Sequence, residues 1–353
     1  MRHHYSSVLF LLVAALSLPA LIHAQDPRFS QYYASPWNLN PAMTGVFTGK
    51  WRVTANYRDQ WGSILGNTPF RTYSVAADAR FNVGGGDDYA AFGVGAMHDE
   101  AGVARYAQNK AQLGAGFIKQ LSGGRYQADH FLSVGAQLGF GQNSVDWSRL
   151  WFTRQFDNIN ERPDDNLSNG EPSMNANSGV YLDFNAGLLW YVLFDENGFF
   201  YAGGAMHHLN APNISLTENG NETLYSRWSG HVGGQLPVTD NFSLLPSAQV
   251  MKQGPAFETD FGLNLRYSNN DYNELALRAG AWARLGNKLD KGIQADAVTI
   301  VGMLELERWM LGLSYDITVS SLAGANNSRG AFEVSLTYFH PEFRRGRVVC
   351  PRF

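Results

Sequence analysis

The chain has six histidines after residue 24, and histidine is the side chain that most often acts as a general base or binds a metal. A serine hydrolase would also need a serine held close to one of them, commonly in the sharp turn written G-x-S-x-G, and the sequence contains no such turn. We therefore predict that the protein is not an enzyme. The six histidines are His98, His130, His207, His208, His231 and His340.

Three further patterns were considered for metal or phosphate binding. His207 and His208 are adjacent, and neighbouring residues of a strand point to opposite faces, so we interpret them as an interfacial pair that cannot bind one ion through both rings. The glycines at 84–86 lack the lysine of a phosphate loop. One polar stretch offers oxygen ligands for calcium, but its spacing is not that of an EF-hand and favours a solvated loop: Asp164, Asp165, Asn166, Asn169 and Glu171. We predict no metal and no cofactor.

A set of charged residues lies at the polar positions of segments that alternate apolar and polar residues. The segments 257–267, 309–316 and 332–338 show this period-two pattern, which indicates strands with one apolar and one polar face. We predict that the charged residues form a lumen-lining network that crosslinks a barrel wall, with a gate or substrate lining as the alternative. They are Glu258, Asp260, Arg266, Arg278, Asp316 and Glu333.

The same alternation recurs along most of the chain and predicts about fourteen strands. A soluble β-sandwich would alternate in the same way, but the apolar faces are too many for one sandwich core, and aromatic residues recur at the strand ends. The pattern therefore predicts an all-β fold, a transmembrane antiparallel barrel of the bacterial outer-membrane type. The expected strands are 50–58, 71–81, 89–98, 105–120, 129–142, 179–194, 198–208, 225–236, 241–251, 256–268, 273–284, 292–304, 307–317 and 329–339.

Composition agrees with this class of protein. Charged residues make up only 16% of the chain, whereas soluble proteins usually contain about a quarter, and there are 37 glycines. The 27 Lys+Arg residues do not outnumber the 31 Asp+Glu residues, so nothing indicates nucleic-acid binding. The single cysteine, Cys350, cannot form an internal disulfide.

The N-terminus predicts export. A basic start at residues 2–4 is followed by an eleven-residue apolar core at 8–18 and a small residue, Ala24, suitable for cleavage. Eleven apolar residues are too few to span a bilayer, so we predict a signal peptide over residues 1–24. No later stretch approaches 18 consecutive apolar residues, and a membrane protein without spanning helices must be a closed barrel.

The lengths of the predicted connections support the barrel. With a periplasmic N-terminus, the connections 82–88, 121–128, 195–197, 237–240, 269–272 and 305–306 face the periplasm, and none exceeds eight residues. The predicted outer connections, among them 59–70, 143–178, 209–224 and 318–328, hold nearly all the long loops, and 252–255 is the one short outer loop. A soluble domain has no reason to separate its loops in this way. An even number of strands also predicts that both chain ends are periplasmic.

Two segments flank the barrel, which is predicted to span residues 50–339. Residues 25–49, which contain Pro27, Pro36 and Pro41, are expected to plug the lumen or to dock a periplasmic partner. Residues 340–353 form a basic tail, expected in the periplasm.

Several motifs resemble one known family along essentially the whole exported chain. The opening D-P-R-F-S-Q-Y-Y-A-S-P at residues 26–36 is followed by L-N-P-A at 39–42 and Y-R-D-Q-W at 57–61. Later motifs are H-H-L-N-A-P at 207–212, S-Y-D at 314–316, G-A-F-E-V-S-L at 330–336 and the final C-P-R-F. With these motifs the sequence resembles the PorP/SprF family of type IX secretion proteins.

The resemblance implies an outer-membrane barrel without catalytic residues. Members of the family assist the secretion or surface anchoring of cargo proteins that carry a C-terminal signal, often large adhesins. Some interact with the periplasmic machinery of secretion and gliding motility. The expected partners are therefore outer-membrane lipid, type IX machinery proteins and a secreted adhesin. A porin or small-molecule transporter is the alternative, which requires an open lumen.

Overall fold

The computed structural model describes residues 25–341, apart from residues 69, 85, 125–126, 165, 171–174, 196–197, 269–274 and 289–291. The predicted signal peptide, residues 1–24, lies outside the described residues, as does the basic tail beyond Pro341. Among the described residues, no helix is long and apolar enough to cross a membrane.

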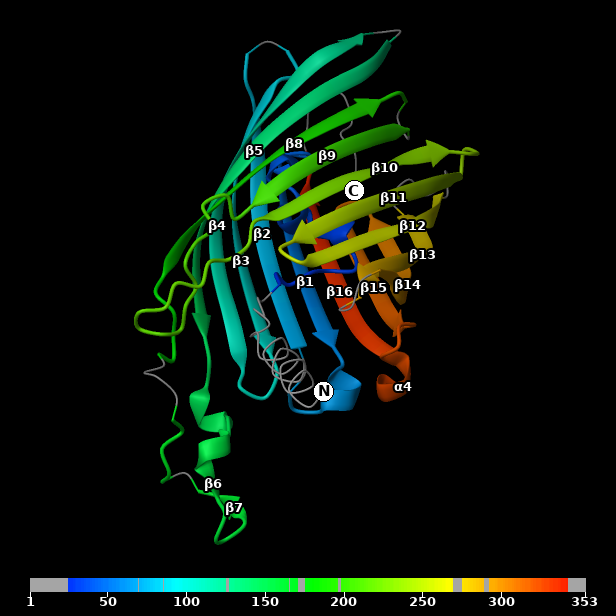
Figure 1. Cartoon of the computed structure of the whole chain (residues 1–353). Coiled ribbons are helices and arrows are strands. Elements are labelled where there is room, and N and C mark those ends of the chain that lie inside the picture. The colour runs from blue at the N-terminus through cyan, green and yellow to red at the C-terminus, as the bar shows by residue number, and fades with distance from the viewer. Residues whose placement is uncertain are drawn as a thin grey trace, which may run out of the picture.

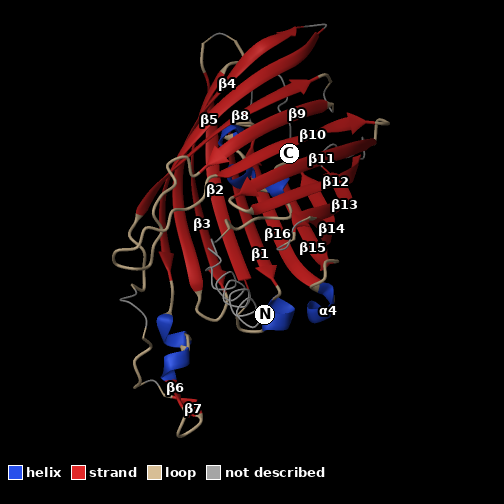
Figure 2. Cartoon of the chain, viewed as in Figure 1, coloured by secondary structure: helices blue, strands red, loops and turns tan. Residues whose placement is uncertain are grey.

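Fourteen antiparallel strands form one closed barrel, which confirms the predicted fold (Figures 1 and 2). Each strand pairs with its neighbour in the chain, and β16 closes the barrel on β1. The predicted strand ends differ from the observed ones by four residues at most, at the end of β4, which was expected at 120 and lies at 124. The strands are β1 (Trp51–Gln60), β2 (Phe70–Asn82), β3 (Tyr89–Ala101), β4 (Tyr106–Gly124), β5 (Gln127–Ser144), β8 (Tyr181–Leu193), β9 (Phe199–His207), β10 (Arg227–Pro237), β11 (Phe242–Gln253), β12 (Ala256–Ser268), β13 (Leu275–Asn287), β14 (Ile293–Leu306), β15 (Trp309–Thr318) and β16 (Arg329–His340).

The remaining elements are short. Three helical turns precede the barrel, and the others lie in its connections, where β6 and β7 pair as a small separate hairpin. They are η1 (Tyr32–Ala34), α2 (Pro36–Leu39), η2 (Pro41–Met43), α3 (Gly62–Leu65), η3 (Trp147–Arg149), η4 (Thr153–Gln155), β6 (Phe156–Asp157), β7 (Arg162–Pro163) and α4 (Ala323–Asn326).

The two ends of the barrel differ in their connections. The end where β1 begins and β16 finishes, here called the short-turn rim, has connections of at most six residues, the longest being 83–88 and 269–274. The opposite end, the long-loop rim, has the connections 145–180 and 208–226 and the helices α3 and α4. In Figure 1 the β6–β7 hairpin extends away from the barrel at this rim. All the long connections therefore lie at one rim, as the sequence predicts, although 102–105, 254–255 and 288–292 at the same rim are short.

The outer surface has an apolar band between two groups of aromatic residues. At the short-turn rim the Tyr338 ring lies 5.0 Å from Trp51 and 4.7 Å from Trp309, measured between centroids. At the long-loop rim the Tyr57 and Tyr73 rings are 5.1 Å apart. Tyr57 follows Trp51 by six positions in β1, which corresponds to about 20 Å along the strand. An apolar band edged with aromatic residues on both sides is typical of outer-membrane barrels.

Candidate functional site

Residues 25–49, called the luminal segment below, run through the inside of the barrel from one rim to the other. Asp26 is paired with residues at the long-loop rim, including Arg227 at the start of β10, and its backbone N–H donates to Gln253 Oε1 at the end of β11. At the other end of the segment, the Lys50 N–H donates to the carbonyl of His340 at the short-turn rim. The segment therefore spans the height of the lumen.

The luminal segment folds into short helical turns because its prolines and polar residues favour them. Pro36 and Pro41 occupy the first positions of α2 and η2, where a missing N–H costs nothing. The Asn40 side chain caps η2 by accepting a hydrogen bond from the Ala42 N–H at 2.9 Å. Gly45 has φ +79°, and a Cβ at this position would clash with Ala91 on β3, so only glycine fits.

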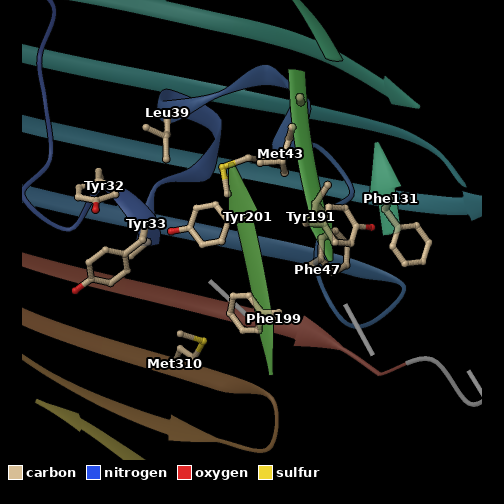
Figure 3. Packing of buried hydrophobic residues seen from close by; sticks show 14 of the residues in the cluster. Tyr32, Tyr33, Leu39, Met43, Phe47, Phe131, Tyr191, Phe199, Tyr201 and Met310 are labelled. Atoms are coloured by element: carbon tan, nitrogen blue, oxygen red, sulfur yellow. The ribbon is translucent and has the colours of Figure 1, made fainter. Parts of the chain in front are cut away.

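The half of the lumen towards the short-turn rim holds much of the apolar packing, beside the buried Arg52–Asp78 ion pair at 2.8 Å. Met43, Val46 and Phe47 of the luminal segment are almost completely buried against inward-facing aromatic residues of the wall (Figure 3). The Phe131 and Tyr191 rings stack at 4.9 Å, and the Tyr33 ring lies 5.3 Å from Trp282. This part of the barrel interior is packed as a hydrophobic core.

Wall glycines make room for one large side chain of the segment, Trp37, which is 2% exposed. A Cβ at Gly95 would lie 2.9 Å from the Trp37 ring, one at Gly114 would lie 2.7 Å from it, and one at Gly93 would be closer still. These strand glycines, which resemble no phosphate-binding motif, therefore allow the wall and the segment to approach each other closely.

The half of the lumen towards the long-loop rim is charged, and two predicted network residues bind the backbone and side chain of the segment there. Glu333 accepts hydrogen bonds from the N–H groups of Ser30 at 2.6 Å and Gln31 at 2.9 Å, and is also paired with Arg58. Asp316 accepts from Ser30 Oγ at 2.7 Å and is paired with Arg58 at 3.0 Å. Arg284 also reaches Asp316, at 2.9 Å.

The other predicted network residues fall into two groups. Asp260 is paired with Arg284 at 2.9 Å, and Glu258 with Arg28 of the luminal segment, so both carboxylates belong to the same cluster as Asp316. Arg266 and Arg278 instead lie on Glu305 of β14, closer to the short-turn rim. Sequence reasoning missed four of these partners: Arg28, Arg58, Arg284 and Glu305. Two of them could have been found from the pairing of neighbouring strands, because Arg58 lies directly opposite Glu333 and Arg284 lies opposite Asp260.

Asp26 is the outermost anchor of the luminal segment. Its carboxylate is paired with Lys110 at 2.9 Å, with His208 Nε2 at 2.5 Å and with Arg227 at 3.1 Å. Burial by itself would raise the pKa of Asp26, but the charges of His208, Lys110 and Arg227 hold it well below its usual value. Burial opposes the charged form of His208, yet the carboxylates of Asp26 and Asp183 raise the pKa of this histidine.

The prediction that His207 and His208 face opposite sides is wrong. Both rings are buried inside the barrel, with their centroids 6.3 Å apart. β9 ends at His207, and His208 adopts φ +56°, a left-handed conformation that breaks the alternation of a strand. Both ring nitrogens of His208 face carboxylate oxygens, which accept: Nδ1 is hydrogen-bonded to Asp183 at 2.8 Å and Nε2 to Asp26. The pair is therefore luminal rather than interfacial.

The residues considered for calcium lie in the connection between β7 and β8. Asp164 accepts hydrogen bonds from the backbone and side chain of Asn166, whereas Asp165 and Glu171 lie outside the described residues. Within the described parts of the chain, no group of three or more His, Cys, Asp or Glu residues is arranged to hold a metal ion.

The sequence model of the family described as type IX secretion system membrane protein PorP/SprF matches residues 22–338. The chain belongs to this family. The resemblance seen in the sequence motifs is thus confirmed, and this PorP/SprF protein is an outer-membrane component of the type IX secretion system. The D-P-R-F-S-Q motif at its start is the part of the luminal segment that contacts Asp316 and Glu333.

Other comparisons add only likeness of fold. No curated protein matches this PorP/SprF protein. CdiB from Escherichia coli is 13% identical with a TM-score of 0.45, over 81% of this chain and 63% of CdiB. The Pseudomonas putida toluene transporter TodX is 11% identical with a TM-score of 0.47, over 86% of this chain and 93% of TodX. The chain spans 60% of CdiB from Acinetobacter baumannii and 63% of the E. coli protein, so it is shorter than both.

Proposed function

We propose that this protein is a non-enzymatic scaffold of type IX secretion whose own N-terminal segment closes its lumen. In this role the protein assists the secretion or surface anchoring of a cargo adhesin. It also links to the periplasmic secretion and gliding machinery. The observation that carries the proposal is the packing of residues 25–49 inside the barrel, where Val46 and Phe47 are 0% exposed. A barrel filled in this way is suited to holding partners on its rims rather than to conducting solutes.

The electrostatics of the lumen support a resident segment. Glu333 and Asp316 are each 2% exposed and accept hydrogen bonds from groups of the luminal segment. Removing the segment would leave polar and charged groups of the wall without these partners in a confined space, which costs about 3 to 5 kcal/mol for each broken buried pair. Of the six predicted charges, Glu258, Asp316 and Glu333 would then serve as the attachment of the segment to the wall.

The porin alternative makes the opposite prediction about conductance. The full-length protein, inserted into a planar lipid bilayer, is expected to show no steady current, because side chains of the segment and wall fill the lumen. A matched variant, Phe47→Ala together with Val46→Ala, removes apolar packing while leaving the charged anchors in place. Steady ohmic conductance of the unmodified protein would overturn the scaffold proposal in favour of a channel.

The secretion role needs a cellular test. Deleting the gene should leave outer-membrane integrity unchanged but prevent one or a few adhesins from reaching or staying on the cell surface. Surface proteomics of the deletion strain, compared with a strain complemented by the intact gene, measures this. Normal display of every adhesin in the deletion strain would contradict the proposal.

We further propose that the long-loop rim faces the outside, with the basic tail in the periplasm. Because Asp26 lies at the long-loop rim, the chain immediately before it would then emerge at the outer mouth rather than in the periplasm. The test uses Cys350→Ser as the background and adds Gln25→Cys or, as an orientation control in the β7–β8 connection, Ser168→Cys. Both cysteines should react with an impermeant maleimide on intact cells. Reaction at residue 168 alone would contradict the placement of residue 25, and reaction at neither would contradict the orientation.

A further inference from the structure

An outward-facing row of polar residues interrupts the aromatic edge of the barrel at the long-loop rim. His98, Asn109 and Gln142 lie directly opposite one another on β3, β4 and β5, and His98 Nδ1 is hydrogen-bonded to Asn109 Oδ1 at 2.8 Å. The same register row contains Tyr57 and Tyr73 on the neighbouring strands. Polar side chains therefore replace the aromatic edge over three strands, on the face that meets lipid.

Next to this row, towards the middle of the membrane, the outer surface of the barrel is recessed because small residues line it. The next outward positions are Ala55 on β1, Ala96 on β3 and Ala111 on β4, and the last two are paired with each other. Val75 and Phe140 lie on either side of the Ala96–Ala111 pair, with 50% and 42% of their surface exposed. The result is an apolar groove of about 780 Å³ that has the polar row at one end.

Between this polar row and the long-loop rim lie charged residues that could bind an anionic group. Arg71 lies 3.4 Å from Asp59, and Arg105 lies 3.8 Å from Glu100. Both arginines are about half exposed, so each can interact with a further anion. An apolar groove that ends in hydrogen-bonding groups and then in arginines matches the order of parts in a phospholipid, from acyl chain to phosphate.

We propose that this groove is a binding site for one anionic, phosphate-bearing lipid of the leaflet at the long-loop rim. Its acyl chain lies over Ala96 and Ala111, and its headgroup contacts His98, Asn109 and Gln142, with Arg71 beside the phosphate. Lipid is the occupant because the groove opens on the membrane-facing surface between the two aromatic groups, where lipid is the neighbour present at highest concentration. The polar row, in which His98 is bonded to Asn109 and Gln142 donates to the carbonyl of Ser178 at 3.3 Å, would otherwise border hydrocarbon.

A second groove provides an internal comparison. It has a volume of about 680 Å³ and lies on the outer surface of β10–β13. The surface is recessed there because the lining includes the small residues Gly234, Ala248, Ala281 and Ala283. No charged residue is among those that line it, within the described part of the chain. It therefore offers space for an acyl chain without groups that select a headgroup.

The proposal is tested with the full-length protein purified in mild detergent, incubated with phosphatidylglycerol or phosphatidylcholine and analysed by native mass spectrometry. The wild type should retain one phosphatidylglycerol through activation that strips phosphatidylcholine. Filling the groove with Ala96→Phe and Ala111→Phe should reduce retention at least tenfold, whereas Ala281→Phe in the second groove should leave it unchanged. Replacing His98 and Asn109 by leucine should abolish the preference between the two lipids.

Folding of every variant is checked by the heat-dependent shift of barrel mobility on electrophoresis, so that loss of lipid is not confused with loss of structure. Equal retention by the wild type and by folded Ala96→Phe, Ala111→Phe protein would overturn the proposal. A second copy of the chain occupying the groove, seen as a dimer that the same substitutions disrupt, would also overturn it. So would equal retention of the two lipids by the wild type.

Discussion

Replacing Glu333 by glutamine tests whether the charged half of the lumen holds the luminal segment in place. Glu333 is 2% exposed and accepts three hydrogen bonds, from two backbone N–H groups of the segment and from Arg58. Glutamine can accept through one oxygen only, and its NH2 group would face a donor. Arg58 keeps Asp316 as a partner at 3.0 Å, so the charge of Arg58 is still paired in the variant.

These contacts set the size of the expected effect. A buried hydrogen bond to a charged group contributes about 1.5 to 3 kcal/mol, and breaking a buried ion pair costs about 3 to 5 kcal/mol. Because Arg58 retains one carboxylate, we expect Glu333→Gln to lower the free energy of unfolding by about 3 kcal/mol, or roughly a hundredfold in the folding equilibrium constant. The matched control is Ser335→Ala on the same strand, which removes a neutral bond to Gln31 and should cost about 1 kcal/mol.

The assay is equilibrium unfolding by urea of protein refolded into lipid vesicles, followed by tryptophan fluorescence and by the electrophoretic shift of the folded barrel. Both probes should report the same order, with wild type most stable, then Ser335→Ala, then Glu333→Gln. A loss for Glu333→Gln no larger than that for Ser335→Ala would refute the reasoning, because it would mean that the carboxylate contributes nothing beyond a neutral hydrogen bond.

Two further substitutions address the packing and the outer anchor of the segment. Gly93→Val should lower the free energy of unfolding by about 2 kcal/mol in the same urea assay, because the new side chain overlaps Trp37. The control Gly302→Ala, whose Cβ has nothing within 4 Å, should change it by less than about 0.5 kcal/mol. Similar costs for the two variants would contradict the close approach of the wall to Trp37. Asp26→Asn should destabilise most between about pH 4 and pH 6.5. Because the pKa of Asp26 is lowered, its contribution to the free energy of unfolding is lost as pH falls below about 4. Because the pKa of His208 is raised, its contribution declines as pH rises above about 6.5. A difference in stability between wild type and Asp26→Asn that does not change with pH would contradict both assignments.

The packing of the luminal segment inside the barrel has a consequence for assembly. The luminal segment precedes β1, and its apolar residues contact β5, β8 and β13 around the whole wall, while β16 closes the barrel on β1. Met43 and Phe47 become buried only when the wall surrounds them. Closure of the barrel and burial of the segment are therefore expected to be one cooperative event, to which the Asp26 anchor adds its ion pairs.

The candidate site was partly readable from the sequence. Glu258, Asp260, Asp316 and Glu333 fall on the polar face of strands whose other face is apolar, so the period of two assigns them to the inside of a barrel without any knowledge of contacts. Their partners could not be assigned in this way. Arg28 and Glu258 are 230 residues apart, and no local pattern connects them.

His208 shows where local reasoning fails. The rule that successive strand residues alternate is valid up to His207, the last residue of β9, and the next residue turns its side chain inward through a left-handed backbone. That conformation is maintained by Asp183 on β8 and Asp26 of the luminal segment, which are distant in sequence. Only the assembled barrel provides these partners.

By itself the sequence determined the number of strands, their approximate ends, the face on which most strand side chains lie and the placement of the long connections at one rim. These properties are local, because strand alternation and turn chemistry act over a few residues. The tertiary structure decided the path of residues 25–49 through the lumen, the choice of ion-pair partners and the groove over Ala96 and Ala111. Each of these depends on register and closure, which bring together residues from opposite sides of the barrel and from opposite ends of the chain.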